Sequence, residues 1–347
     1  MTRQPSRIVV FGAGSVGCYV GGRLLSAGAD VTLIGRRRLQ DVFTEQPLKV
    51  TDYEGFEFST SLSPDQFTTD PGAAAGADLV LVTTKSAATE EAGAQLAEFL
   101  EPGTPVISLQ NGITNADRLQ GLLPECTVLA GMIPFNVLEK APGHFHHGTQ
   151  GQLMAAASPR LEPALPWFQA AGLPLEERDD MEPVMWSKLL LNLNNPINAL
   201  SGVPLREELA QRDYRRCLAM AQEETLTLLE MAGIRTVKVT AIPTQLIPYV
   251  MKTPNWLFKR LADKMLTIDP YARSSMWEDI EAGRPTEVDW INGEVVNLAT
   301  RLNTRAPVNQ ALTQLIHQCE MDPSQAWPAP ALLRHLQGAL DDYRARR

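Results

Sequence analysis

The chain lacks several features that would place it in other classes of protein. It has no uninterrupted run of about 20 apolar residues, the length that a membrane span needs, and residues 1–7 show no signal-peptide cleavage region. The four cysteines, at positions 18, 126, 217 and 319, are far apart, which favours reduced thiols over disulfides or zinc. The histidines at 144, 146 and 147 have no cysteine or carboxylate nearby at ligand spacing, so we expect no metal ion. These absences predict a cytoplasmic protein.

An excess of positive charge is also missing. The 347 residues include 31 Lys and Arg against 40 Asp and Glu, a formal net charge of −9. An acidic chain repels nucleic-acid phosphates and anionic lipids, so we expect neither nucleic acid nor a membrane as a partner. The hydrophobic content of 44% is ordinary for a globular protein. A chain longer than roughly 250–300 residues usually splits into two domains.

Two patterns of hydrophobicity divide the chain near residue 180. In residues 1–180, buried-type strands are predicted at 8–11, 31–34, 79–83, 106–109 and 128–131, with helices at 16–27, 86–100 and 115–122. This alternation predicts a mostly parallel sheet covered by helices, a Rossmann-type α/β domain. We also expect an antiparallel hairpin of 144–147 with 152–156, a helix over 161–171 and a strand over 173–176.

Residues 181–347 carry the helical period alone. Helices are predicted over 182–193, 214–232, 244–251, 256–265, 274–282, 288–302 and 308–320. The second domain is therefore expected to be all-helical, and its apolar helices over 288–302 and 308–315 suggest a homodimer.

A glycine-rich turn, Gly12-Ala13-Gly14-Ser15-Val16-Gly17, joins the first predicted strand to the first predicted helix. The pattern is weak by itself, but in this context it is typical of a dinucleotide-binding site. Gly12 allows the tight turn, Gly14 lets a pyrophosphate approach the backbone, and Gly17 permits close packing of helix on strand. The phosphates are expected at the helix N-terminus. The alternative is a glycine-rich turn without a ligand.

A run of three arginines, Arg36–Arg38, follows the second predicted strand, where an acidic residue would bind the adenosine ribose of NAD. A guanidinium at this point would instead bind a 2′-phosphate through charge-assisted hydrogen bonds. The run therefore predicts NADP(H), with Arg36 as the phosphate ligand. For Arg37 and Arg38 a solvated basic loop is the favoured interpretation.

Polar residues follow two further strands at the edge of the sheet where ligands of open α/β folds bind. Lys85 comes directly after a buried strand, and Asn111 lies in a Gln-Asn-Gly turn after the next one. Either could be ordinary turn chemistry. The alternative is that they contact a ligand bound at this edge, and the residues alone leave the two interpretations open.

A polar stripe crosses the apolar helix predicted over 182–193 and just beyond it. Lys188, Asn192 and Asn195 are spaced i, i+4 and i+7, which places them on one helix face. A lysine beside an apolar wall has a lowered pKa and suits the role of a general acid. The alternative is a solvent-facing stripe, although exposed faces usually pair Glu with Lys.

These segments together resemble the ketopantoate reductase (2-dehydropantoate 2-reductase) family along nearly the whole chain. The matching segments are the glycine-rich turn at 12–17, Thr84-Lys85, Gln110-Asn111-Gly112, the hairpin with Pro142-Gly143, His146 and Gly148, Trp186-Ser187-Lys188-Leu189 with Asn192, and the pair 274–280 and 286–293. The resemblance implies NADPH-dependent reduction of a small 2-oxo acid and a second domain of the 6-phosphogluconate-dehydrogenase C-terminal type.

The resemblance also implies roles for residues of the second domain. Lys188 would be the catalytic lysine and Glu287 its acidic partner, while Ser275 would contact the substrate carboxylate. The contacts to substrate and nicotinamide would be completed by Asn111, Asn192 and Asn195. Lys85 would lie near the cofactor. Because Glu287 opens a predicted helix, simple helix capping is its alternative role.

The chain departs from the family pattern in places that affect substrate shape. The second amide after the lysine, Asn195, comes one residue early, and Leu205 and Arg206 stand where the family has an asparagine; the 236–270 region is also longer. A reductase of another 2-oxo or β-keto acid is therefore an alternative function. A non-catalytic NADP(H)-sensing module is a further alternative, which the intact Lys188 and Glu287 argue against.

Overall fold

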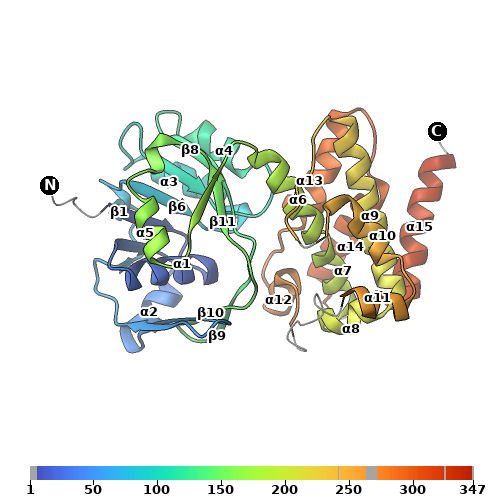
Figure 1. The fold of residues 1–347 in the computed structure, drawn as a ribbon, viewed down its shortest axis with the longest axis horizontal. Coiled ribbons are helices and arrows are strands. Elements are labelled where there is room, and N and C mark those ends of the chain that lie inside the picture. The colour runs from blue at the N-terminus through green and yellow to red at the C-terminus, as the bar shows by residue number, and fades with distance from the viewer. Residues whose placement is uncertain (1–5, 241, 263–271, 324–325, 346–347) are drawn as a thin grey trace. The chain divides into compact units, whose positions relative to one another are not determined.

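The structure is a computed structural model, and it describes residues 6–240, 242–262, 272–323 and 326–345 (Figure 1). The chain divides into two compact units, Met1–Met181 and Glu182–Arg347. None of the described helices combines the length and the apolar character of a membrane span. All four cysteines are free thiols.

The first unit is built on an eight-stranded sheet in the order β12-β11-β8-β7-β6-β1-β2-β5. Its strands are β1 (Arg7–Phe11), β2 (Asp30–Ile34), β5 (Phe67–Thr68), β6 (Leu79–Val82), β7 (Pro105–Ser108), β8 (Thr127–Met132), β11 (Leu153–Ala156) and β12 (Leu175–Arg178). All neighbours are parallel except β8 and β11. The predicted mostly parallel Rossmann-type sheet is therefore confirmed.

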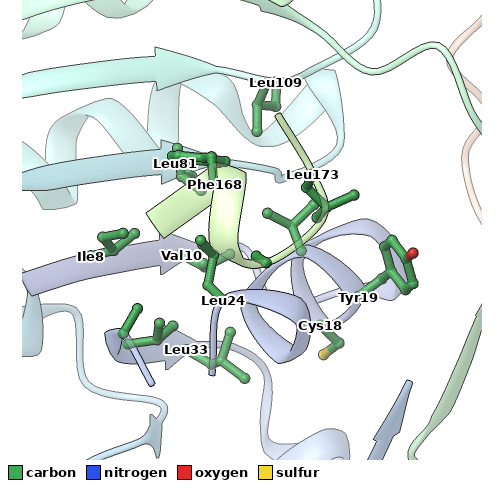
Figure 2. Packing of buried hydrophobic residues seen from close by; sticks show 14 of the residues in the cluster. Ile8, Val10, Cys18, Tyr19, Leu24, Leu33, Leu81, Leu109, Phe168 and Leu173 are labelled. Atoms are coloured by element: carbon green, nitrogen blue, oxygen red, sulfur yellow. The ribbon is translucent and has the colours of Figure 1, made fainter. Parts of the chain in front are cut away.

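Alternate side chains of these strands point to opposite faces, and helices bury both. Ile8 and Val10 lie on the face covered by α1 (Ser15–Ser26) and α5 (Leu165–Ala170), where Figure 2 shows them near Leu24 and Phe168. The other face is covered by α3 (Thr89–Ala97) and α4 (Asn115–Leu122). Because both faces of the sheet are buried, each of these strands is a continuous run of apolar residues in the sequence.

The predicted hairpin of 144–147 with 152–156 is wrong. β10 (His144–His147) instead belongs to a second sheet, whose strand order is β4-β3-β10-β9. There it pairs antiparallel with β9 (Val137–Ala141) and parallel with β3 (Leu48–Asp52). The remaining strand, β4 (Glu57–Thr60), pairs with β3. The chain reverses one turn earlier than predicted, at Gly143, whose φ of +74° suits a tight turn. Phe145 of β10 is fully buried and packs in the core beneath α1. β11 belongs to the eight-stranded sheet.

Short elements complete the first unit. They are α2 (Arg37–Glu45), η1 (Pro71–Ala74), η2 (Ser86–Ala88) and η3 (Pro159–Leu161). The predicted helix over 86–100 is divided into η2 and α3, and that over 161–171 into the end of η3 and α5.

In the second unit, the described residues form helices and no strand, as predicted. The helices are α6 (Met181–Asn192), α7 (Asn194–Ser201), α8 (Leu205–Ala210), α9 (Arg212–Met231), η4 (Thr244–Leu246), α10 (Ile247–Met251), α11 (Asn255–Ala262), α12 (Ser275–Glu281), α13 (Val288–Arg301), α14 (Pro307–Met321) and α15 (Ala329–Ala345). The long helix α9 packs against α10, α14 and α15. The predicted helix over 256–265 is described to residue 262, and its last three residues lie outside the described residues.

Candidate active site

The glycine-rich turn between β1 and α1 is shaped by close backbone approaches. Gly12 has a φ of +104°, and a Cβ there would lie 2.5 Å from the Thr84 nitrogen; a Cβ on Gly17 would lie 2.6 Å from Thr83 Oγ1. Both positions therefore require glycine. At Gly14, by contrast, the nearest atom to an added Cβ is the Gly12 carbonyl oxygen at 3.9 Å. The space beside Gly14 is open, which fits a pyrophosphate approaching the backbone.

The start of α1 presents backbone N–H groups that could donate to such a group. Gly14 is the N-cap residue, and no side chain caps the helix. The first amides of a helix have no partner inside it, and the helix dipole favours an anion beside them. Ser15, Val16 and Gly17 supply these amides. The residues present thus fit the phosphates of a dinucleotide, as predicted from the motif.

The end of β2 is tied to this turn, which brings Arg36 close to it along the chain. The nitrogens of Gly12 and Ala13 donate to the Ile34 carbonyl at 2.9 and 2.8 Å. A Cβ on Gly35 would lie 2.8 Å from the Ala13 Cβ, so Gly35 packs directly on the turn. Arg36 is the next residue and the N-cap of α2.

The three arginines differ in their partners. Arg37 forms an ion pair with Asp41 at 3.1 Å, and Arg38 forms one with Glu139 at 2.9 Å. Arg36 is exposed and makes no ion pair with any described residue. The basic loop expected at Arg37 and Arg38 is instead the first turn of α2. Of the three guanidiniums, that of Arg36 is the one left for a ligand.

Lys85 and Asn111 occupy the carboxyl ends of neighbouring strands. Lys85 is the exposed N-cap residue of η2, directly after β6, and Asn111 is half-buried in the turn after β7. The Ser86 hydroxyl donates to the Asn111 carbonyl at 3.0 Å, so the two turns are joined. The position of both residues at this edge agrees with the prediction, while their contacts to a cofactor stay predictions.

A buried amide network, which the sequence reasoning missed, holds these turns in place. Gln110 Nε2 donates to the Thr84 carbonyl at 3.2 Å and to Thr89 Oγ1 at 2.8 Å. Thr89 Oγ1 donates in turn to Asn115 Oδ1 at 3.0 Å, and Asn115 Nδ2 donates to the Ser86 hydroxyl. An amide at the end of an apolar strand, as in Leu-Gln-Asn, was the signal available.

In the second unit, Lys188 lies on α6 between fully buried neighbours. Trp186 is 1% exposed and Leu189 is 3% exposed, while Lys188 itself is half-buried. The adjacent Ser187 is fully buried; its hydroxyl donates to the Pro183 carbonyl at 2.7 Å and accepts from the Val237 nitrogen at 2.8 Å. These bonds fix the turn of helix that carries the lysine.

Burial and one carboxylate set the charge state of this lysine. Burial lowers the pKa of Lys188 to about 8, against a partial rise caused by the negative charge of Glu287. A lysine in that range is still largely protonated at neutral pH and gives up its proton readily. The direction of this pKa shift is the one expected for a lysine beside an apolar wall, while the catalytic roles of Lys188 and Glu287 stay predictions.

Glu287 is 6% exposed and stands at the N-cap position of α13, where its side chain makes no capping hydrogen bond. The Thr286 hydroxyl performs that task instead by accepting from the Val288 nitrogen at 3.3 Å. Helix capping, the alternative role for Glu287, is thus taken by its neighbour. The negative charge of the buried carboxylate acts on Lys188, and its contact with a substrate stays a prediction.

The expected single helix face with Lys188, Asn192 and Asn195 is only partly correct. α6 ends at Asn192, and α7 begins at Asn194 after a break at Leu193. The cause is Pro196, which has no N–H to donate to the carbonyl four residues earlier and would clash with it. Lys188 and Asn192 share a face of α6, whereas Asn195 lies on the next helix. Neither amide side chain hydrogen-bonds another described residue.

Ser275 begins α12 and is exposed. Its helix is held to α7 through two residues that sequence reasoning missed: the Ser274 hydroxyl donates to the Asn195 carbonyl at 3.2 Å, and Asn198 Oδ1 accepts from the Ser274 nitrogen at 2.8 Å. The second unit thereby joins the segments of Ser275 and Asn195. Their contacts to a substrate stay predictions.

Comparison with known proteins identifies the family of this chain. The model for "Ketopantoate reductase PanE/ApbA" matches residues 8–159, and that for its C-terminal part, "Ketopantoate reductase PanE/ApbA C terminal", matches residues 180–320. The chain belongs to the ketopantoate reductase family. The predicted family and the predicted helical C-terminal domain of that family are therefore confirmed.

Similar proteins span nearly the same length. A 2-dehydropantoate 2-reductase from Pyrococcus horikoshii is 29% identical, over 89% of this chain and 96% of its own. One from Halobacterium salinarum is also 29% identical, over 91% and 99%. The crystal structure of a PanE/ApbA family ketopantoate reductase from Ralstonia eutropha superposes with a TM-score of 0.78 at 28% identity, over 91% and 98%.

Proposed function

We propose that this protein reduces 2-dehydropantoate to pantoate with NADPH, a step that leads to pantothenate and coenzyme A. The observation that carries the proposal is Lys188, whose pKa is held near 8 by burial and the Glu287 charge. A lysine tuned in this way is a proton donor for a carbonyl that becomes an alkoxide. Membership of the ketopantoate reductase family supports the same activity and the assignment of this protein as an NADP-dependent oxidoreductase.

The first unit supplies the cofactor site. NADPH, when bound, supplies the hydride. Gly14 and the amides at the start of α1 would hold its pyrophosphate, and the Arg36 guanidinium would hold the adenosine 2′-phosphate through paired hydrogen bonds. Lys85 and Asn111, at the carboxyl edge of the sheet, would bind the remainder of the cofactor.

The second unit supplies the proton. As the carbonyl carbon of the substrate gains hydride, its oxygen takes a proton from the Lys188 ammonium, and the neutral amine is reprotonated from solvent. Glu287 would accept a hydrogen bond from the substrate hydroxyl and keep Lys188 protonated at neutral pH. Ser275 would hold the carboxylate, and the amides of Asn192 and Asn195 would orient the rest of the substrate.

We also propose a homodimer that works in the cytoplasm. The apolar residues of α13 and α14 are buried within their own unit, so they do not supply the contact surface first expected of them. Large apolar side chains are instead exposed in the 246–261 region, where Tyr249 and Trp256 are 67% and 70% exposed. One structural neighbour, from Staphylococcus aureus, is described as a dimeric ketopantoate reductase.

A different 2-oxo or β-keto acid is the second candidate substrate. Asn195, which comes one residue early for the family pattern, lies on α7 beyond the one-residue break at Leu193. The non-catalytic sensor is less well supported, because sensing alone gives no reason to keep a lysine with a pKa near 8.

Steady-state kinetics with purified protein tests the proposal. NADPH and NADH are each offered with ketopantoate, shorter and longer 2-oxo acids and a branched β-keto acid, and kcat/KM is compared. We expect the highest value for NADPH with ketopantoate. Another preferred acid would replace the substrate assignment, and tight NADPH binding without turnover of any acid would favour the sensor.

A further inference from the structure

Two side chains of α14 bracket the position of Glu287 from both sides. On one side, the Thr286 nitrogen donates to Glu320 Oε1 at 2.7 Å. On the other, Asp289 Oδ1 lies 3.1 Å from His317 Nε2. His317 and Glu320 are one helical turn apart and meet at 3.0 Å between Nδ1 and Oε2. One continuous chain of contacts, which we call the bracket, therefore runs from Asp289 through His317 and Glu320 to Thr286 and surrounds Glu287.

We propose that His317 and Glu320 are positioning residues that hold Glu287 in register with Lys188. The inference rests on the role proposed above for Glu287. Neither residue needs to touch substrate or cofactor. Their function would be to fix the backbone immediately before and after the carboxylate, so that its distance to the lysine is constant.

The local backbone explains why such a bracket is needed. Glu287 has no capping bond of its own to fix it at the start of α13. The preceding residues 282–285 are exposed, and Gly283 has a φ of +62°. Thr286 is the last residue before Glu287, and Glu320 binds its nitrogen. A displacement of about 1 Å at a reacting group can cost roughly 100-fold in rate, so this anchoring bears directly on turnover.

The bracket is complete only when His317 carries a charge. Burial lowers its pKa, but the contacts with Glu320 from its own helix and Asp289 from α13 outweigh burial, and the pKa is raised overall. An imidazolium donates from both ring nitrogens, whereas neutral imidazole has one donor. Above the raised pKa, one of the two carboxylates therefore loses its hydrogen bond.

The first test measures the Lys188 pKa without any need for turnover. The rate at which an amine-acylating reagent modifies Lys188 is followed against pH by mass spectrometry. Glu287→Gln removes the charge that raises this pKa and should lower it. Glu320→Ala should lower it in the same direction by a smaller amount. Gln318→Ala, on the same helix and exposed, should leave it unchanged. An unchanged Lys188 pKa in Glu320→Ala would overturn the proposal.

The second test is a double-mutant cycle on kcat/KM. Glu320→Ala should cost about tenfold in the wild-type background, as for one lost hydrogen bond to a charged group, and should cost nothing further in Glu287→Gln. Glu320→Gln keeps an oxygen for the Thr286 nitrogen and should restore most of the loss. Equal losses in both backgrounds would show a general structural effect and reject the positioning role.

The two tests separate this inference from the proposed function. If ketopantoate is not turned over, the acylation series still reports whether Glu320 acts on Lys188 through Glu287. If Glu320→Ala does not fold, His317→Gln preserves size and removes the doubly donating ring, and the same lowered Lys188 pKa is expected. No shift in that variant would count against the bracket.

Discussion

The two units assemble their functional residues in opposite ways. In the first unit the site is a short stretch of backbone, in which glycines at 12, 14 and 17 either clear space or permit a turn. In the second unit the proposed site consists of side chains from α6, α12 and α13, and burial and the charge of Glu287 set the pKa of its central residue, Lys188. Binding of a dinucleotide depends on shape and free amides, whereas proton transfer depends on a tuned pKa.

This difference predicts that the two functions can be broken separately. A substitution in the glycine-rich turn should weaken cofactor binding and leave the pKa of Lys188 unchanged. A substitution at Lys188 or Glu287 should impair proton transfer and leave the affinity for the cofactor unchanged. The experiments below test that separation, beginning with the largest effect.

Lys188→Ala should lower kcat by about 10²–10⁴-fold, the usual contribution of a general acid, while the Kd for NADPH stays at the wild-type value. Steady-state kinetics and a fluorescence titration of NADPH measure the two quantities. Lys259→Ala, which removes an exposed lysine of the same unit, is the matched control. A loss of NADPH affinity equal to the loss of kcat would mean that the two functions are not separate.

Gly14→Val should weaken NADPH binding by roughly 100-fold, because the side chain fills the open space where the pyrophosphate approaches. Its backbone conformation is extended, so thermal stability should be unchanged. Gly12→Ala meets the Thr84 nitrogen at 2.5 Å in a left-handed conformation and should lower Tm as well. Titration and thermal unfolding of both variants check this contrast. Wild-type affinity in Gly14→Val would contradict the placement of the phosphates.

Arg36→Ala should weaken NADPH binding by about 10–100-fold, the value of a charge-assisted contact of about 1.5–3 kcal/mol, and leave NADH binding nearly unchanged. Arg37→Ala is the matched control, since Arg37 already pairs with Asp41. Titrations of both variants with NADPH and with NADH measure these changes in affinity. Equal losses for NADPH and NADH would remove the assignment of Arg36 to the 2′-phosphate.

The same contrast explains how much could be read from the sequence. Strands β1, β2, β6, β7 and β8 were predictable because each is a continuous apolar run, and the glycine-rich turn is contiguous. β9, β3 and β4 were missed because they are only partly buried and alternate with polar residues. The pairing of β10 with β3 joins residues far apart in the chain, and no local pattern reveals it.

In the second unit, residue types were predictable but their surroundings were not. The break at Leu193 could have been inferred from Pro196, and α15 from the apolar spacing of Leu332, Leu333 and Leu336. The contacts of His317 and Glu320 with the start of α13 depend on how α14 packs. Whether Glu287 or its neighbour Thr286 caps α13 was likewise not predictable, because the Thr286 hydroxyl accepts from the Val288 nitrogen only in the folded structure.

The central claim is that burial and the Glu287 charge together make Lys188 the proton donor. The most direct test is the pH dependence of kcat/KM, which reports groups of the free enzyme, for the wild type and Glu287→Gln. Because the protonated lysine is the active form, the wild-type value should fall as pH rises through about 8. In Glu287→Gln the fall should begin at lower pH, since the charge that favours the ammonium is gone. A descending limb at the ordinary lysine pKa of 10.5, or one that Glu287→Gln does not move, would contradict the account.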